Sequence, residues 1–167
     1  MASRLVFDPL VALRAAPLIS STCTLLYAWD QHLFLTNFNL TETRKLSTPL
    51  VTPYFKAFFR RAIYQVLGFL AVTASTSVAN LYTRRAALDA RGSAAWWYTA
   101  GALLAGGHLV FVPFIAPSVK DLIEGKDGEE ANDTLDRWLS VNAVRGLTVD
   151  LGAWVACAIA VGKTLVA

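Results

Sequence analysis

Charged residues and cysteines are scarce in this chain. Only 16% of its 167 residues are charged and 55% are hydrophobic, whereas soluble globular domains carry about 25% charged residues. Because the chain is this apolar and its net charge is only +3, intrinsic disorder is excluded. Two cysteines are too few for a small domain held together by disulfides. The mean hydropathy of +0.46 therefore indicates an integral membrane protein.

Signatures of nucleotide and metal binding are also missing. The sequence contains no P-loop, no dinucleotide fingerprint, no HExxH and no CxxC. A metal site from His32, His108 and a carboxylate is the remaining alternative. These residues have no ligand spacing within one helix, so we expect no metal site.

The apolar residues gather into four long runs. A helix needs about 20 apolar residues to cross about 30 Å of hydrocarbon. We predict spans at about 15–35, 62–82, 95–119 and 141–161. Helices are expected because a lone segment in lipid must satisfy its own backbone hydrogen bonds. The predicted fold is all-α, a four-transmembrane-helix bundle that forms a single integral membrane domain over residues 1–167.

The orientation in the membrane is predicted from two short motifs. Basic residues lie on both sides of the spans, so the positive-inside rule gives no orientation. Asn39 and Asn132 begin glycosylation sequons, and both lie in loops on the side away from the termini. We therefore expect a multi-pass protein of the endoplasmic reticulum with cytosolic termini.

Trp138, Asn142 and Arg145 lie on one face of the fourth span, because their spacing is i, i+4, i+7. Val149 continues that stripe. An ionisable group near the membrane centre costs roughly 2.5–3.5 kcal/mol, so Arg145 is expected to face the bundle interior. An aromatic, an amide and a permanent cation on one face could hold a flat, oxygen-bearing ligand.

His108 lies on a second stripe, in the third span. Gly101, Ala105, Val112 and Ile115 share its helix face, and the small residues allow another helix to approach closely. A neutral imidazole facing the interior is a natural general base near pH 7. Val112 is the expected substrate contact of this stripe. The alternative is a histidine that only makes hydrogen bonds across helices.

The first span adds a carboxylate and a phenol. Tyr27 and Asp30 share a face, whereas His32 lies about 200° away from Asp30 around the helix. We expect Tyr27 to contact substrate, Asp30 to face the interior and His32 to lie at the interface. The structural alternative is that Arg145 pairs with Asp30 or Asp150 and only holds the bundle together.

The run LDRWLSVNAVRGLTVDLGAW resembles the signature of a family of small four-helix membrane proteins that includes the fungal anthrone oxygenases. The family pattern is a Trp, an Asn four residues later and an Arg three after that. Here these are Trp138, Asn142 and Arg145. The segment FVPFIAPSVKDL is similar to a second family motif, with Val119 where the family has Asn.

The resemblance implies oxygenation of an anthrone-like aromatic at its activated CH2 group, with O2 as co-substrate and no flavin, haem or other cofactor. In that reaction His108 would be the base, and Arg145 and Asn142 would hold the oxyanion. Trp138 would be a stacking wall. Asp30 would orient the histidine or balance Arg145.

Three functional classes follow from these residues. The first is a membrane enzyme of secondary metabolism that acts on a lipophilic small molecule from the bilayer. The second is a non-catalytic four-helix scaffold or assembly partner, in which the buried charges satisfy each other and no pocket remains. A small transporter is the third, and it would have to oligomerise. We expect no nucleic-acid partner, and homo-oligomerisation is left open.

Overall fold

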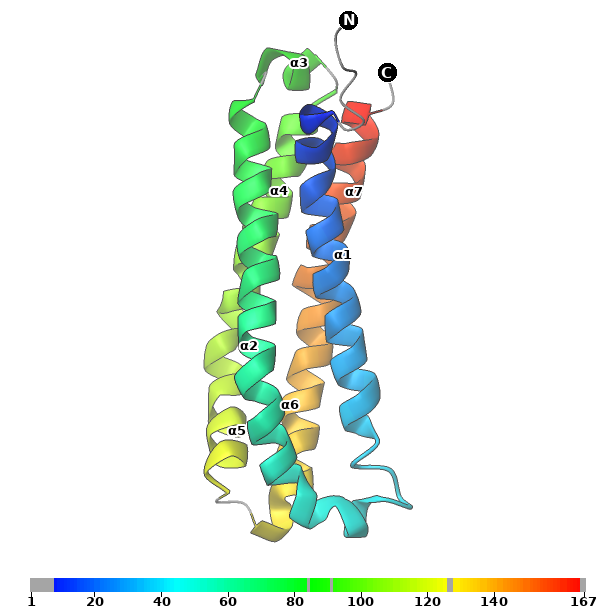
Figure 1. Cartoon of the computed structure of the whole chain (residues 1–167), viewed down its shortest axis with the longest axis vertical. Helices are drawn as coiled ribbons and strands as arrows, with labels where there is room; N and C mark the ends of the chain where they lie inside the picture. Colours follow the sequence, from blue (N-terminus) through cyan, green and yellow to red (C-terminus); the bar gives the residue numbers. More distant parts are fainter. Residues whose placement is uncertain (1–7, 84, 91, 126–127, 166–167) are drawn as a thin grey trace, which may run out of the picture.

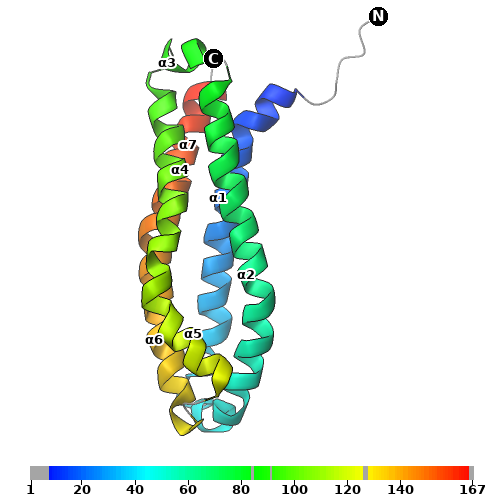
Figure 2. The ribbon, with the colours of Figure 1, turned by 90° about the vertical axis from the view of Figure 1, so that its left-hand side faces the viewer.

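Four helical rods run alternately up and down in the part of the chain that the structure describes (Figures 1 and 2). The computed structural model describes residues 8–83, 85–90, 92–125 and 128–165. The first two rods are the unbroken helices α1 (Pro9–Thr36) and α2 (Arg44–Tyr82). The short helix α3 (Arg85–Ala90) follows α2.

The third and fourth rods are each built from three consecutive segments. The third consists of α4 (Ala94–Gly107), the 3-10 turn η1 (His108–Phe111) and α5 (Val112–Glu124). After the 3-10 turn η2 (Gly128–Glu130), the fourth consists of α6 (Ala131–Arg145), the π-helical turn η3 (Gly146–Asp150) and α7 (Leu151–Leu165).

All four rods are long and apolar enough to cross a membrane, within the described residues. The predicted all-α fold with four candidate spans is therefore confirmed. The rods are longer than the predicted apolar runs, and α2 alone has 39 residues. Since about 20 residues cross the hydrocarbon, α2 extends well beyond it.

The rods pack in a ring in which α1 contacts α2 and α7, and α4 contacts α2 and α7. Toward the other end, α5 packs on α6. Helix α1 begins and α7 ends at the same end of the bundle, which Figure 1 shows at the top.

Apolar side chains fill the end of the bundle opposite to the start of α1. This core combines residues from all four rods, and its buried members are Leu35, Val51, Phe55, Leu122, Ala131, Leu135, Trp138 and Leu139. The middle of the bundle is more polar, because α1 and α2 turn hydroxyl side chains inward. The buried ones are Ser20, Ser21, Thr24, Thr73 and Ser77.

Helices α4 and α7 approach each other closely at Gly101. A Cβ atom at this position would lie 2.8 Å from Cys157 Sγ, whereas a Cβ at Gly106 in the same helix would have no atom within 4 Å. We therefore expect Gly101→Val to lower the free energy of unfolding by about 1–3 kcal/mol through overpacking. The matched variant Gly106→Val should stay within about 0.5 kcal/mol, as for an open surface site.

Thermal unfolding of both variants in detergent checks this expectation. Equal midpoints for Gly101→Val and Gly106→Val would contradict the close approach of α4 and α7.

The two predicted sequons are tied into the tertiary structure. Asn132 is buried, and its Nδ2 donates to Phe38 O (3.0 Å), Asn39 Oδ1 (2.7 Å) and Ser47 Oγ (3.1 Å). Asn39 Nδ2 donates to Asn132 O at 2.9 Å. Because a glycan is attached through Nδ2, the folded structure does not favour modification of Asn132. Cytosolic termini and the endoplasmic reticulum stay predictions.

Candidate functional site

The third and fourth rods both depart from α-helical geometry where they face each other. The turn η1 begins at His108 and contacts α6, while η3 ends at Asp150 and contacts α4. Pro113 follows η1, and its missing N–H cannot continue the hydrogen-bond ladder. Short π-helical turns occur frequently at functional sites. The two irregular turns therefore point to this level of the bundle as a candidate functional site.

The π-helical turn brings Asp150 to the face of Arg145. In a regular α-helix, residues five apart point about 140° away from each other. The i→i+5 hydrogen bonding of a π-helix puts more residues in each turn and brings the two side chains much closer to one face. Accordingly, Arg145 Nε donates to Asp150 Oδ2 at 3.2 Å.

His108 completes a buried triad around this carboxylate. Its Nδ1 lies 2.9 Å from Asp150 Oδ1, and the exposed fractions of His108, Arg145 and Asp150 are 5%, 4% and 2%. An ionised carboxylate only accepts hydrogen bonds, so a neutral imidazole bound to it in this way carries its proton on Nδ1 and keeps the lone pair of Nε2 free. Asp150 also neutralises the charge of Arg145. We call these three residues the charged triad.

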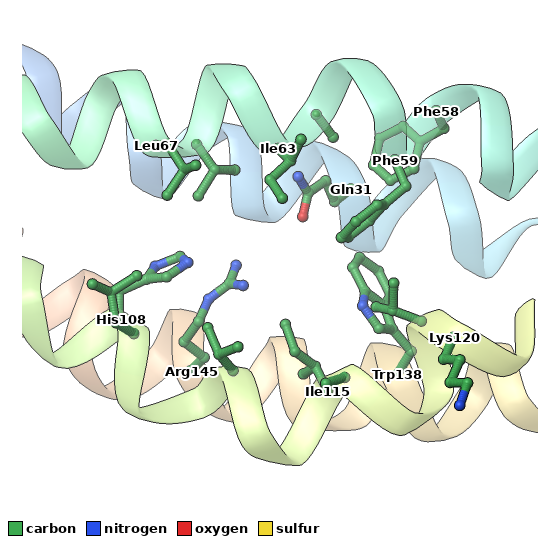
Figure 3. A pocket seen from close by; sticks show the side chains of 16 residues that line it. Gln31, Phe58, Phe59, Ile63, Leu67, His108, Ile115, Lys120, Trp138 and Arg145 are labelled. Carbon is green, nitrogen blue, oxygen red and sulfur yellow. The ribbon is translucent and has the colours of Figure 1, made fainter. Parts of the chain in front are cut away.

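A cavity of about 280 Å³ lies beside the charged triad, between α1, α2, α5 and α6 (Figure 3). His108 and Arg145 reach into it from one part of the wall, Trp138 stands further along, and Gln31 reaches in from α1. The rest of the wall is almost entirely apolar. It is formed by Phe58, Phe59, Ala62, Ile63, Val66, Leu67, Leu109, Val112, Ile115, Ala116 and Val119, with Lys120 at the edge.

The cavity has an apolar rim that faces outward. Ile63 and Leu67 of α2, Leu109 of η1 and Val112 of α5 all line the cavity, and all four are exposed on the outside of the bundle. In a membrane-spanning bundle, such a surface faces lipid. The rim of the cavity between α2 and α5 would therefore face the bilayer.

The structure brings four of the predicted site residues together at the cavity: His108, Arg145, Trp138 and Val112. Asn142 is not among them. It is buried one layer behind, where its Nδ2 donates to Gln31 Oε1 at 3.4 Å. Asn142 therefore contacts the cavity-lining residue Gln31 without reaching the cavity itself. It also lines a separate groove between α1 and α6.

One prediction for α1 is wrong, and Tyr27 as a substrate contact stays a prediction. Asp30 is exposed, and Asp150 both orients His108 and balances Arg145. The reason is the phase of α1, because its buried face passes through Gln31, one residue or about 100° away. Tyr27 does not line the cavity either. It is half-buried and packs edge-on against Phe69, with ring centroids 6.3 Å apart.

His32 lines the groove between α1 and α6, away from His108. Among the residues that the structure describes, no group of three or more His, Cys, Asp or Glu side chains gathers closely enough to hold a metal ion.

Sequence reasoning missed Gln31 and gave Asp150 only a structural role. A signal for Gln31 was present. Ser20, Thr24 and Gln31 recur at helical spacing in α1 and mark a polar, inward-facing stripe. A glutamine between two ionisable residues draws less attention than its neighbours, although its amide has both donors and an acceptor.

A family model described as anthrone oxygenase matches residues 55–155, which is more than half of the chain. The chain belongs to the anthrone oxygenase family. The matched segment includes Trp138 and all of the charged triad. Family membership confirms the resemblance found in the sequence motifs.

Curated relatives of this family member are fungal epoxidases. The chain is 26% identical to epoxidase pydX of an Acremonium species, over 96% of this chain and 99% of that protein. It is 28% identical to epoxidase gkaX of Penicillium citrinum, over 86% and 88% of the two chains. It is 29% identical to probable epoxidase scpX of Mollisia scopiformis, over 92% and 96%. No solved structure matches.

Proposed function

We propose that this member of the anthrone oxygenase family is a membrane-embedded oxygenase of secondary metabolism. Its substrate would be a lipophilic molecule with an acidic O–H or C–H group, and O2 would react with the anion of that substrate. The observation that supports this proposal is a charged triad, of which His108 and Arg145 stand in the wall of an apolar cavity with a rim toward the bilayer.

The charged triad fits the formation of a substrate anion. Nε2 of His108 would accept the substrate proton, while the bond from Nδ1 to Asp150 stabilises the resulting imidazolium. Only Nε of Arg145 is committed to Asp150, so its terminal N–H groups would hold the oxyanion in two-pronged fashion. The apolar walls exclude water, which strengthens both interactions.

The electron balance of the reaction narrows the substrate class. Epoxidation of an isolated alkene by O2 needs two further electrons to reduce the second oxygen atom to water. A hydroquinone carries these electrons itself, since hydroquinone and O2 give an epoxyquinone and one water. Because the curated relatives are epoxidases, we favour epoxide formation on such an electron-rich ring.

Conversion of an anthrone to an anthraquinone is the second candidate, and the family description favours it. It balances in the same way, because a CH2 group and O2 give a ketone and one water. Both reactions begin with the same proton transfer and the same oxyanion, so the charged triad fits either of them.

A purely structural scaffold fits the geometry less well. That alternative requires the buried charges to satisfy each other with no pocket left over. Arg145 and Asp150 do pair, but a cavity of about 280 Å³ remains beside them. A cavity of this size with a few convergent polar groups is typical of a ligand site.

The test uses the purified chain in nanodiscs under 18O2, with menadiol and emodin anthrone as separate probes. We expect protein-dependent formation of menadione epoxide or emodin, each with one 18O atom in the product and the other in water. Metal analysis and chelation accompany the assay. Turnover that disappears on chelation would contradict reaction through the substrate anion alone, and lack of turnover of both probes would contradict the proposed substrate class.

Arg145→Lys tests the oxyanion assignment. A lysine keeps the charge beside Asp150 but lacks the planar pair of N–H groups. We therefore expect kcat to fall about 10²-fold, as after loss of an oxyanion donor, with little change in the unfolding midpoint. Arg137→Lys is the control, because Arg137 lies exposed in the same helix. Full activity of Arg145→Lys would contradict the assignment.

A further inference from the structure

Trp138 is a rigid hydrogen-bond donor without an acceptor. The residue is 3% exposed, and its Nε1 is buried with no hydrogen-bond partner among the residues that the structure describes. A buried indole N–H usually finds a partner, because leaving it unpaired costs free energy. An unpaired group of this kind in a cavity wall calls for an explanation.

The position of the indole is determined by its apolar neighbours and not by the N–H. Its ring packs edge-on against Phe55, with centroids 5.3 Å apart and planes at 82°. Phe55 is itself buried within the same apolar core. The indole is thus held in place in the cavity wall without a hydrogen bond, which is the preorganised geometry of a recognition group.

The cavity therefore has two chemically different ends. Arg145 and His108 supply the charged end. Trp138 lies seven residues before Arg145 in the same helix, which is about 10 Å at 1.5 Å per residue. Figure 3 shows the two side chains well separated along the cavity, with the apolar Ile115 between them.

From this arrangement we infer that Trp138 Nε1–H binds a neutral acceptor oxygen of the substrate, such as a carbonyl, at the end of the molecule remote from its acidic group. The inference rests on the proposed function for the identity of the charged end. It specifies the substrate class further: a flat body about two to three rings long, acidic at one end and with an acceptor oxygen at the other. It also replaces the stacking role predicted for Trp138 by a polar, specificity-determining one.

The test compares the binding of two probes that differ in one group. 6-Acetyl-2-naphthol has a phenol at one end and a carbonyl at the other, and 6-isopropyl-2-naphthol has the same shape without the carbonyl. Their dissociation constants are measured by fluorescence in nanodiscs, for the wild-type chain and for Trp138→Phe, which keeps an aromatic ring but has no N–H. For each probe, the Kd of Trp138→Phe is divided by the Kd of the wild-type chain. The partition of the probe into lipid is the same in both and cancels in this ratio.

We expect Trp138→Phe to raise the Kd of the acetyl probe about 5-fold, as for the loss of one hydrogen bond. The Kd of the isopropyl probe should change less than 2-fold. Phe59→Leu, which alters the neighbouring wall, should weaken both probes alike. Equal effects of Trp138→Phe on the two probes, or no effect on either, would overturn the inference.

A second measurement does not depend on the folding of the variant. On the wild-type chain, the infrared C=O stretch of the bound acetyl probe should lie below its frequency in empty nanodiscs. An unshifted stretch would overturn the inference. These readouts are independent of turnover, so selective binding of the acetyl probe without turnover of menadiol or emodin anthrone would contradict the proposed function and leave the recognition role of Trp138 intact.

Discussion

Asp150→Asn is expected to reduce kcat about 10³-fold or more and to destabilise the bundle at the same time. The carboxylate accepts from both His108 Nδ1 and Arg145 Nε. An amide offers only one acceptor, so at least one of these bonds is lost and the tautomer of His108 is no longer fixed. The buried guanidinium also loses its counter-charge, and breaking a buried pair in this way costs about 3–5 kcal/mol.

Steady-state turnover and thermal unfolding in detergent measure the two effects. Asp30→Asn is the matched control, because Asp30 is the exposed acid that the sequence pattern favoured. We expect its kcat and unfolding midpoint to equal those of the wild type. Should Asp30→Asn lose activity while Asp150→Asn keeps it, the charged triad would not be the site.

His108→Ala is expected to lower kcat about 10²–10⁴-fold, the usual contribution of a positioned general base. Substrate binding should change little, because the apolar walls and Arg145 remain. The variant also creates space beside Asp150 into which free imidazole can enter. We therefore expect added imidazole to restore part of the rate.

The control for this experiment is His32→Ala. His32 lies in the groove between α1 and α6, away from the cavity, so its removal should leave kcat unchanged, with or without imidazole. A general base is ruled out if His108→Ala retains the wild-type rate. A lowered unfolding midpoint together with a rate that imidazole does not restore would assign His108 a purely structural role.

The two variants remove parts of one unit, so their effects should not add. In the double variant Asp150→Asn, His108→Ala, the orienting carboxylate has no base left to orient. We expect its kcat to resemble that of His108→Ala alone, as for residues that act together in catalysis.

Hydrophobicity and helical periodicity were sufficient to predict the bundle. Apolar runs about 20 residues long can only form helices in lipid, so the four candidate spans could be read from the chain. The i, i+4, i+7 spacing also identified Trp138 and Arg145 as inward-facing, because α6 is a regular helix from Ala131 to Arg145. Burial of Gly101 and Ala105 in α4, and of His108 at the start of η1, followed for the same reason.

Only the tertiary structure showed which acidic residue contacts His108 and Arg145. Beyond Arg145, a regular α-helix would place Val149 on the inward face. The π-helical turn η3 changes the angle per residue and turns Asp150 inward instead. In the third rod the turn η1 has a similar effect, since Val112 is exposed at the cavity rim and does not continue the buried stripe. A periodic pattern assumes one constant angle per residue, and both irregular turns break that assumption at the level of the site.

The phase of α1 relative to its neighbours was the other property that only packing could determine. Asp30 and Gln31 differ by about 100° around the helix, and the more polar of the two was a reasonable choice from sequence. Contacts with α2 and α6 turn Gln31 inward and leave Asp30 exposed. The sequence thus determined which helices form and most of their inward faces, while the packing of the rods and their two irregular turns decided which polar groups meet.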